Sequence, residues 1–548
     1  MMKLDKIKEK CKEIGKNPIM RMRFLLLAAF IFIITLMAWQ SDDAYHGYVM
    51  AKHLVEGNGF VYNIGQRASA STGPLYTLII ALFYFLTGEM YFTSLAVNII
   101  FSAIAYGIVS FCFCKTREQV VYAFLALVAS PSFISYTTSG LENCLLFLLV
   151  AWFLKCYYEK ESFNSLELLR LALILSALAM ARMDAALMLV PMIVYVYLMK
   201  RDRVSFPKAV GLTFLGLAPF ILWVLFSTFY FGFPVPNTAY VKLGTDIALA
   251  EYIKKGIWYI YYTFLNDMVV LLLPAIYIMT TIFTRSMKHI CQALGILLYG
   301  AYVVYIGGDF MMGRHFTVLL LMSVIGIVRV SNFLAGIDIR LAGKSARVFR
   351  ACALISVVYL MTFVPLIGSQ YLVNGCFEPG GAISDERAYY WPTTGLFPNV
   401  RSLIRTGRLC IEDTWNYDSV EEIRENGWRG NITSNSAGIL VYYNSDLYLN
   451  DTYCLGDPFL SKLPAIKQDT WRVGHLRRAV PDGYYETVMY GKNVIADDDL
   501  AKYYDIICEM TQGELFSADR LKTVIEWNMG KYDYLLEHYT AGLKEDEK

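Results

Sequence analysis

Residues 41–77 read SDDAYHGYVMAKHLVEGNGFVYNIGQRASASTGPLYT, directly after the first long apolar run of the chain. Asp42 and Asp43 therefore stand where an apolar helix ends and a polar loop begins. An ionised acid costs desolvation energy at a membrane, so a pair of acids in this place indicates a functional site. If a helix runs from here to Glu56 and ends at Gly57, its dipole favours the charged form of both acids.

The two acids have a chemical interpretation and a plain one. As carboxylates they can accept the proton of a hydroxyl group or hold a metal ion, whereas the plain alternative is that Ser41 or Asp42 caps the helix. His46 and His53 are seven residues apart and share a helix face, where they can contact phosphate or metal, although simple interfacial packing is the commoner role. We predict Asp43, or Asp42, as the catalytic residue and leave a divalent cation open.

Composition places the chain among polytopic membrane proteins. Of its 548 residues 56% are hydrophobic and only 18% are charged, and the mean hydropathy is +0.42. The net charge of +2 does not favour nucleic acid as a partner. A basic tail precedes the apolar run Phe24 to Trp39, and no small-residue cleavage site follows it. This pattern predicts an uncleaved first helix with a cytoplasmic N-terminus.

Apolar runs long enough to span a bilayer predict about eleven transmembrane helices. They lie near residues 22–40, 91–114, 119–137, 143–158, 166–181, 185–200, 208–231, 267–284, 289–306, 314–330 and 351–370. The run 74–87 is shorter, starts with Pro74 and ends at Gly88, and is predicted to be re-entrant. With this count the basic connections fall on one side of the membrane, as the positive-inside rule requires.

An odd number of spans places the polar residues 371–548 outside the cell. The segment is long enough for a separate domain. It contains a strand-like run, 439–443, and helical stretches near 399–407, 499–511 and 518–539. The predicted fold is thus a polytopic α-helical membrane domain over residues 1–370, followed by a C-terminal extracytoplasmic α/β domain.

Residues 42–78 resemble the first outer loop of bacterial GT-C glycosyltransferases, above all the group of the mycobacterial terminal beta-(1->2)-arabinofuranosyltransferases. Further motifs of this family recur in chain order, at predicted outer helix ends. They are TSGLE at 138–142, ARMD at 181–184, GFPVPNTAYVK at 232–242, and GGDFM at 307–311 with Arg314; looser matches are ND at 450–451, LGDP at 455–458 and WRVGH at 471–475. Met183, where relatives commonly have proline, and Gly73, where many have another residue, depart from the pattern.

The resemblance covers nearly the whole chain and implies a GT-C fold, which agrees with the roughly eleven spans predicted from the apolar runs. It implies an enzyme that moves a sugar, such as arabinofuranose, from a polyprenyl-phosphate donor to a cell-envelope glycan or glycolipid. The reaction would take place on the outer face of a bacterial plasma membrane, and no nucleotide cofactor is implied.

A leaving phosphate needs fixed positive charge where its negative charge develops. The candidates come from the motifs at predicted outer helix ends. Donor-phosphate candidates are Arg314, Arg182, Lys242 and His315; substrate-binding candidates are Glu142, Asp184, Asn237, Tyr240 and Asp309. The plain alternatives are snorkelling anchors for the basic residues and structural ion pairs for the acids.

Two other functions compete with the enzyme. A transporter or flippase of lipid-linked sugars predicts charges or broken helices near the membrane midplane, often in repeated halves. In this sequence the polar residues gather at predicted outer helix ends, and there is no internal repeat. A non-catalytic glycan-binding scaffold would not require the paired acids.

Overall fold

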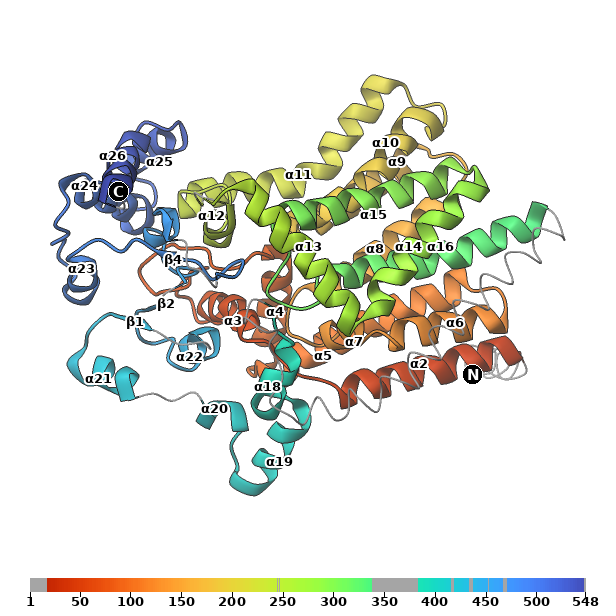
Figure 1. Ribbon diagram of the computed structural model, residues 1–548, viewed down its shortest axis with the longest axis horizontal. Helices are drawn as coiled ribbons and strands as arrows, with labels where there is room; N and C mark the ends of the chain where they lie inside the picture. The colour runs from red at the N-terminus through yellow and green to blue at the C-terminus, as the bar shows by residue number, and fades with distance from the viewer. Residues whose placement is uncertain are drawn as a thin grey trace, which may run out of the picture.

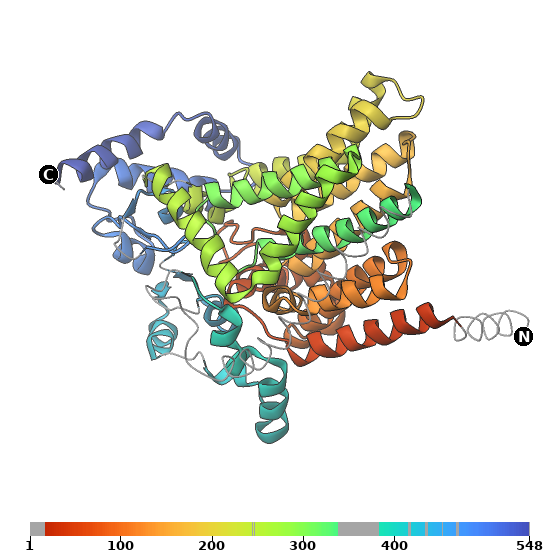
Figure 2. The ribbon, with the colours of Figure 1, turned by 45° about the vertical axis from the view of Figure 1, so that its right-hand side comes forward.

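A bundle of apolar helices occupies one side of the molecule, and the C-terminal residues lie at one end of that bundle (Figures 1 and 2). The computed structural model describes residues 17–243, 245, 247–337, 383–414, 418–432, 437–451, 453–466 and 471–546. The N-terminal helix points away from the C-terminal region, while the end of the chain lies within that region (Figure 1).

The bundle is built from helices of very different lengths. They are α2 (Pro18–Leu36), α4 (Pro74–Thr87), α5 (Tyr91–Ile108), α6 (Arg117–Val128), α7 (Pro131–Tyr136), α8 (Asn143–Glu159), α9 (Ser165–Ala181), α10 (Val190–Tyr195), α11 (Phe206–Phe231), α13 (Leu249–Asn266), α14 (Met268–Thr284), α15 (Met287–Tyr305) and α16 (Phe316–Ile337). Two further helices, α3 (Asp42–Val55) and α12 (Asn237–Leu243), lie between the bundle and the C-terminal region.

Four helices of the described residues are long and apolar enough to cross a membrane: α2, α5 with its π-helical extension to Phe113, α11 and α15. A fifth span results if α13 and α14, which meet at a 107° bend, are counted together. Large apolar side chains such as Leu25 and Phe214 are exposed on the sides of these helices. This surface fits a polytopic membrane protein. The count of eleven spans stays a prediction, and residues 351–370 lie outside the described part.

Several predicted spans are broken where the sequence contains a proline or polar residues. The run 119–137 divides into α6 and α7, because Pro131 starts a new helix that Ser130 caps. The run 185–200 combines a 3-10 turn, the short α10 and a π-helical turn. Helix α13 was not predicted, since Glu251, Lys254 and Lys255 interrupt its apolar pattern.

The short run before α5 forms a single helix with the predicted bounds. Helix α4 starts at Pro74, and Gly88 follows it in the left-handed conformation that ends a helix without steric cost. Its re-entrant course through the membrane stays a prediction.

The C-terminal region is mainly helical. Its helices are α18 (Glu386–Thr394), α19 (Leu396–Thr406), α20 (Cys410–Thr414), α21 (Asp418–Asn426), α22 (Ala437–Tyr443), α23 (Tyr484–Tyr490), α24 (Asp498–Gln512), α25 (Ala518–Asn528) and α26 (Asp533–Asp546). Among the described residues, β1 (Gly430–Ile432) pairs in parallel with β2 (Leu449–Asp451), and β3 (Ala465–Ile466) pairs antiparallel with β4 (Arg477–Arg478). The helical prediction 518–539 is interrupted between α25 and α26, where Gly530 has a positive φ angle.

The predicted strand at 439–443 is wrong, because these residues belong to helix α22. A short run of apolar residues does not by itself distinguish a buried strand from a buried helix. Here the decision is tertiary: α22 packs closely on α3, and a Cβ atom at Gly438 would lie 2.3 Å from the carbonyl oxygen of Asp42. The glycine permits this approach of the two backbones.

The C-terminal region and the bundle share buried contacts. The fully buried Arg520 donates hydrogen bonds to the backbone carbonyls of Phe229 and Tyr230 at the end of α11. On another side, the Leu396 N–H donates to the carbonyl of Ala38 just beyond α2. A bridge between Met311 and Ser384 adds a third connection. The region is therefore held against the bundle at several points.

Candidate active site

Helix α3 carries the paired acids and is fixed by the TSGLE motif. The backbone N–H of Ser41 donates to the Ser139 carbonyl at 2.8 Å, and the Tyr48 hydroxyl donates to the Gly140 carbonyl at 3.0 Å. Gly140 has φ +80°, and a Cβ atom there would lie 2.6 Å from the Tyr48 hydroxyl oxygen. These contacts explain why two motifs far apart in sequence meet: the glycine lets the loop lie against α3.

Asp42 connects helix α3 to helix α22 of the C-terminal region. Its carboxylate accepts hydrogen bonds from the N–H groups of Ile439 at 2.8 Å and Gly438 at 3.2 Å, at the start of α22. Ser41 occupies the N-cap position of α3, as expected, but its side chain makes no capping hydrogen bond there, and the Asp42 carboxylate caps α22 instead of its own helix. Burial raises the pKa of Asp42 well above its usual value, although the Ile439 N–H opposes this.

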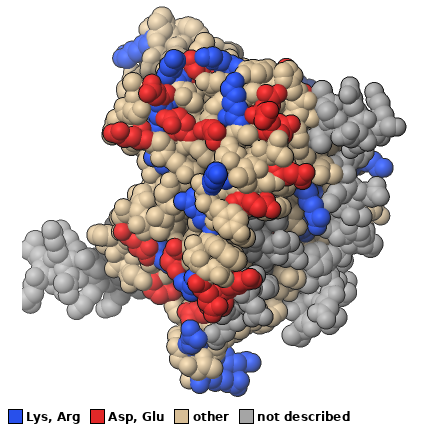
Figure 3. Space-filling model, turned by 90° about the vertical axis from the view of Figure 1, so that its left-hand side faces the viewer, with Lys and Arg blue, Asp and Glu red and all other residues tan. Residues whose placement is uncertain are grey.

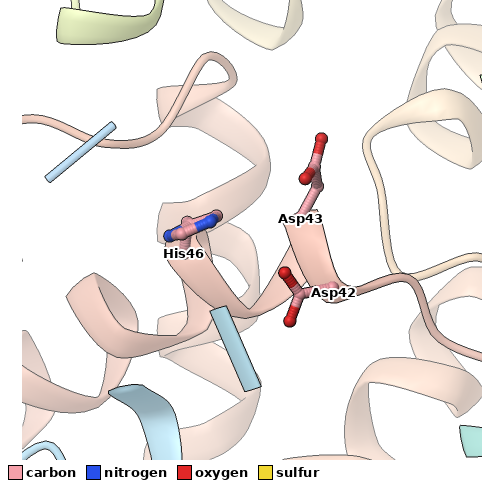
Figure 4. A group of neighbouring side chains, drawn as sticks. All are labelled: Asp42, Asp43 and His46. Carbon is pink, nitrogen blue, oxygen red and sulfur yellow. The ribbon is translucent and has the colours of Figure 1, made fainter. Parts of the chain in front are cut away.

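Asp43 points in a different direction from Asp42, away from α22 (Figure 4). Its carboxylate is partly buried and makes no hydrogen bond to any of the described residues. Burial raises the pKa of Asp43, whereas His46 and the cations of Arg314 and Lys242 act in the opposite direction. Of the two acids, Asp43 is thus the one that remains available to a ligand.

Asp43 lines two neighbouring cavities. The larger, about 800 Å³ including its open mouth, is bounded by α3, the loop 70–73 and the three basic residues Arg182, Lys242 and Arg314. The smaller, about 420 Å³ on the same measure, extends toward Glu386 and Arg472 of the C-terminal region. The residues that line both are Asp43, His46, Phe310, Leu455, Gly474 and His475.

Glu142 is the centre of a buried ion network beside the larger cavity. One oxygen of its carboxylate, Oε1, accepts from Arg182 and from Arg314, each at 3.0 Å, and Arg182 Nε donates to Asp184 at 2.8 Å. Burial by itself would raise the pKa of Glu142, but Arg314 and Arg182 hold it below its ordinary value. Both guanidinium groups are therefore held in place by carboxylates.

His315 and Asp309 extend this network behind the cavity wall. His315 Nε2 lies 3.3 Å from Asp309 Oδ2, and Arg314 Nη1 lies 3.8 Å from the same oxygen. The other ring nitrogen of His315 is 2.9 Å from the Tyr299 hydroxyl. Burial and Arg182 lower the pKa of His315. Burial works against the ionised form of Asp309, but Lys242 and His315 hold its pKa well below the usual range.

Lys242 differs from the two arginines. It lies on α12, lines the larger cavity, and forms no ion pair with a carboxylate in the part of the chain that the structure describes. Its side chain passes the backbone of Gly474, where an added Cβ atom would lie 3.3 Å from the lysine Cε. Lys242 is accordingly the cation whose charge is available to an anionic ligand.

Asn237 and Tyr240 of the same helix lie elsewhere. Lys462 donates to the Asn237 side-chain oxygen at 3.1 Å, and its ammonium group lies 4.1 Å from the centre of the Tyr240 ring. Asn237 also donates to the Leu455 carbonyl at 3.3 Å. Neither side chain lines either cavity. In this arrangement the two residues hold α12 against the C-terminal region and leave Thr238 and Lys242 facing the larger cavity.

Sequence reasoning missed Glu386 and assigned no role to Arg472 or His475. Glu386 is buried, accepts a hydrogen bond from the Ser384 hydroxyl at 2.7 Å, and faces the smaller cavity. Burial, with a contribution from Asp43, raises its pKa to about 8. Arg472 and His475 belong to the WRVGH motif, which the sequence already singled out. Glu386 begins the polar helix α18 and belongs to none of the motifs, so nothing in the sequence pointed to it.

Asp42, Asp43 and His46 also form a potential cation site. One ligand atom from each lies within 4.8 Å of the others (Figure 4). Magnesium and calcium ions take six or more ligands, mostly oxygen. The three side chains would therefore hold such a cation only with water or with ligand oxygens, and both Asp42 oxygens already accept N–H bonds.

Substitution of Asp42 by alanine is expected to weaken the junction between α3 and α22. The change leaves two buried N–H groups without their acceptor, and each such group costs about 1–3 kcal/mol. The expected result is a lower melting temperature in detergent for D42A, with D42N in between because an amide oxygen still accepts one bond. D498A serves as the control, at an exposed position in the first turn of α24. Equal melting of D42A and wild type would contradict this role.

No family model matches the chain, and none of the curated proteins that were compared matches it. Among solved structures, the chain is similar to ArnT from Cupriavidus metallidurans bound to undecaprenyl phosphate. The identity is 10%, the TM-score is 0.41, and the match covers 77% of this chain and 74% of that one. Similarity at this level assigns neither a family nor an activity to the chain.

Proposed function

We propose that the protein is a membrane glycosyltransferase of the GT-C class, which transfers a sugar from a polyprenyl-phosphate donor to a hydroxyl group of a glycan or glycolipid. The observation that carries this proposal is the position of Asp43. Its carboxylate is free of hydrogen bonds to the described residues and lies between a cavity lined by cations and a second cavity that reaches the C-terminal region.

The larger cavity suits the donor. Departure of a polyprenyl phosphate develops negative charge on the bridging oxygen, and cations that are already in place stabilise this charge best. Arg182 and Arg314 are oriented by Glu142, and Lys242 can bind a phosphate oxygen directly. Helix α3, which carries Asp43, lies between the apolar bundle and the C-terminal region (Figure 1), and this position beside membrane-spanning helices suits a lipid-linked donor.

The smaller cavity suits the acceptor. In the reaction, the acceptor oxygen bonds to the anomeric carbon while the bond from that carbon to the phosphate oxygen breaks. Asp43 takes the hydroxyl proton, and polyprenyl phosphate leaves with the electron pair of the broken bond. Glu386 and Arg472 line the acceptor side and can hydrogen-bond to sugar hydroxyls. The resemblance in sequence suggests arabinofuranose as the sugar and the outer face of a bacterial plasma membrane as the location.

The proposal is tested with the purified full-length protein, a polyprenyl-phospho-sugar and a hydroxyl-bearing glycan. The expected result is a new glycosidic product, identified by mass spectrometry, together with released polyprenyl phosphate. A comparison of envelope glycans with and without the gene identifies the acceptor in the cell. Movement of the intact lipid-linked sugar across a vesicle membrane, without any new glycosidic bond, would instead establish a transporter.

Lys242 provides a separate test of the donor site. Loss of a charged hydrogen bond costs about 1.5–3 kcal/mol, so K242A should lower kcat/KM for the lipid donor roughly 10- to 100-fold. We expect K242R to retain more activity, because its charge remains. Lys254, an exposed lysine on α13, supplies the control variant K254A. Unchanged donor kinetics in K242A would remove Lys242 from the phosphate site.

A further inference from the structure

Helix α19 lies where α2, the first apolar helix, ends. The Leu396 N–H at the start of α19 donates to the Ala38 carbonyl at 2.9 Å, and Arg387 of α18 donates to the Met37 carbonyl at 3.0 Å. In Figure 2, α19 extends downward at the lower edge of the molecule, across the direction of α2. Since α2 is long enough to span a bilayer and mostly exposed, its end marks the level of the bilayer surface.

The exposed face of α19 is both apolar and basic. Phe397 is 45% exposed and Ile404 is 80% exposed, although both are large apolar side chains. Arg401 and Arg405 stand beside them at helical spacing and are also exposed. A basic patch is visible at the lower edge of the molecule, where α19 lies (Figure 3). Apolar residues bordered by arginines are typical of helices that lie in a membrane surface.

A groove along α19 is lined by both apolar and basic residues. Its walls come from the end of α18 and from α19. It is lined by Trp391, Pro392, Phe397, Pro398, Arg401, Ser402, Arg405 and Thr406. Within the described residues, Arg401 and Arg405 form no ion pair, whereas Arg408 lies 3.9 Å from Glu412. Two arginines that pair with no acid among the described residues, beside an apolar wall, suit a ligand that carries both a phosphate group and a hydrocarbon chain.

We propose that this groove binds the phosphate group of an anionic membrane lipid, with α19 lying in the bilayer surface at the end of α2. Arg401 and Arg405 bind the phosphate oxygens, since a guanidinium group matches them in geometry and charge. Phe397 and Ile404 enter the acyl region. The site lies outside the two cavities of the proposed active site and does not depend on the reaction proposed for them.

The depth of α19 is measured in nanodiscs with a genetically encoded fluorescent amino acid in place of Ile404 and lipids with brominated acyl chains. The control position is Tyr490, which is 65% exposed at the end of α23, on the side of the C-terminal region farthest from the bundle (Figure 1). We expect strong quenching at position 404 and little at position 490. Absence of quenching at 404 would overturn the membrane position of α19.

Charge is tested separately by native mass spectrometry of the full-length protein with phosphatidylglycerol or phosphatidylcholine. The wild type should retain phosphatidylglycerol preferentially, and the double variant R401E/R405E should lose this preference on the order of tenfold or more. The control is K492E/K522E, which reverses two exposed lysines of the C-terminal region, one just after α23 and one on α25. Equal loss in both double variants, or no loss in R401E/R405E, would overturn the lipid-phosphate site.

Discussion

Substitution of Asp43 by asparagine is expected to remove most of the transfer activity and leave the protein folded. Asparagine has the same shape but cannot take a proton, and a positioned general base contributes typically ~10²–10⁴-fold to a rate. Asp43 makes no hydrogen bond to the described residues, so its replacement breaks no contact of that kind. The loss should therefore appear in kcat while the melting temperature stays near that of the wild type.

The measurement is transfer from a polyprenyl-phospho-sugar in detergent, with thermal melting of each variant. E56Q is the matched control, because Glu56 is an exposed acid at the other end of the same helix. Full turnover by a correctly folded D43N would show that Asp43 is not the general base. That result would favour a transporter of lipid-linked sugars or a glycan-binding scaffold. The same assay on D42N separates the two acids, since Asp42 acts on the junction with α22.

Substitution of Glu142 by alanine is expected to have the largest effect on stability. Glu142 is 4% exposed and its Oε1 atom receives both Arg182 and Arg314. Removing one partner of a buried ion pair leaves uncompensated charge and typically costs about 3–5 kcal/mol. E142A should melt far below the wild type or fail to accumulate. E142Q should lose less, because its side-chain oxygen can still accept hydrogen bonds.

The difference in melting temperature between wild type and E142Q, measured as a function of pH, tests whether the ionised form of Glu142 stabilises the fold. The folded-state pKa of Glu142 lies below its ordinary value, so its ionised form stabilises the fold above the unfolded pKa of about 4.5. That stabilisation is lost as the pH falls through the folded pKa. The difference in melting temperature between wild type and E142Q should thus be greatest near neutral pH and shrink below about pH 4.5. A melting-temperature difference that does not change with pH would indicate that Glu142 stabilises the fold through packing and not through its charge.

Many elements could be predicted because their cause is local. Pro74 and Gly88 define α4 whatever surrounds it, and the length and apolarity of α2, α11 and α15 require no knowledge of neighbours. The break at Pro131 has a local cause as well, but apolar runs on either side concealed it. The run 439–443 had no local signal that separates strand from helix, and its contact with α3 decided the outcome.

The candidate site divides in the same way. The sequence by itself determined that Asp42 and Asp43 stand together at the end of an apolar helix, and that basic motifs follow at other helix ends. Only the tertiary structure decided which of the two acids can bind a ligand. Asp42 is occupied, because it accepts hydrogen bonds from the first turn of helix α22, almost 400 residues later in the chain. The tertiary structure also decided that Lys242 lines the larger cavity whereas Asn237 does not, and that Glu386 lines the smaller one. Side-chain direction and long-range contact follow from packing, which no single stretch of sequence encodes.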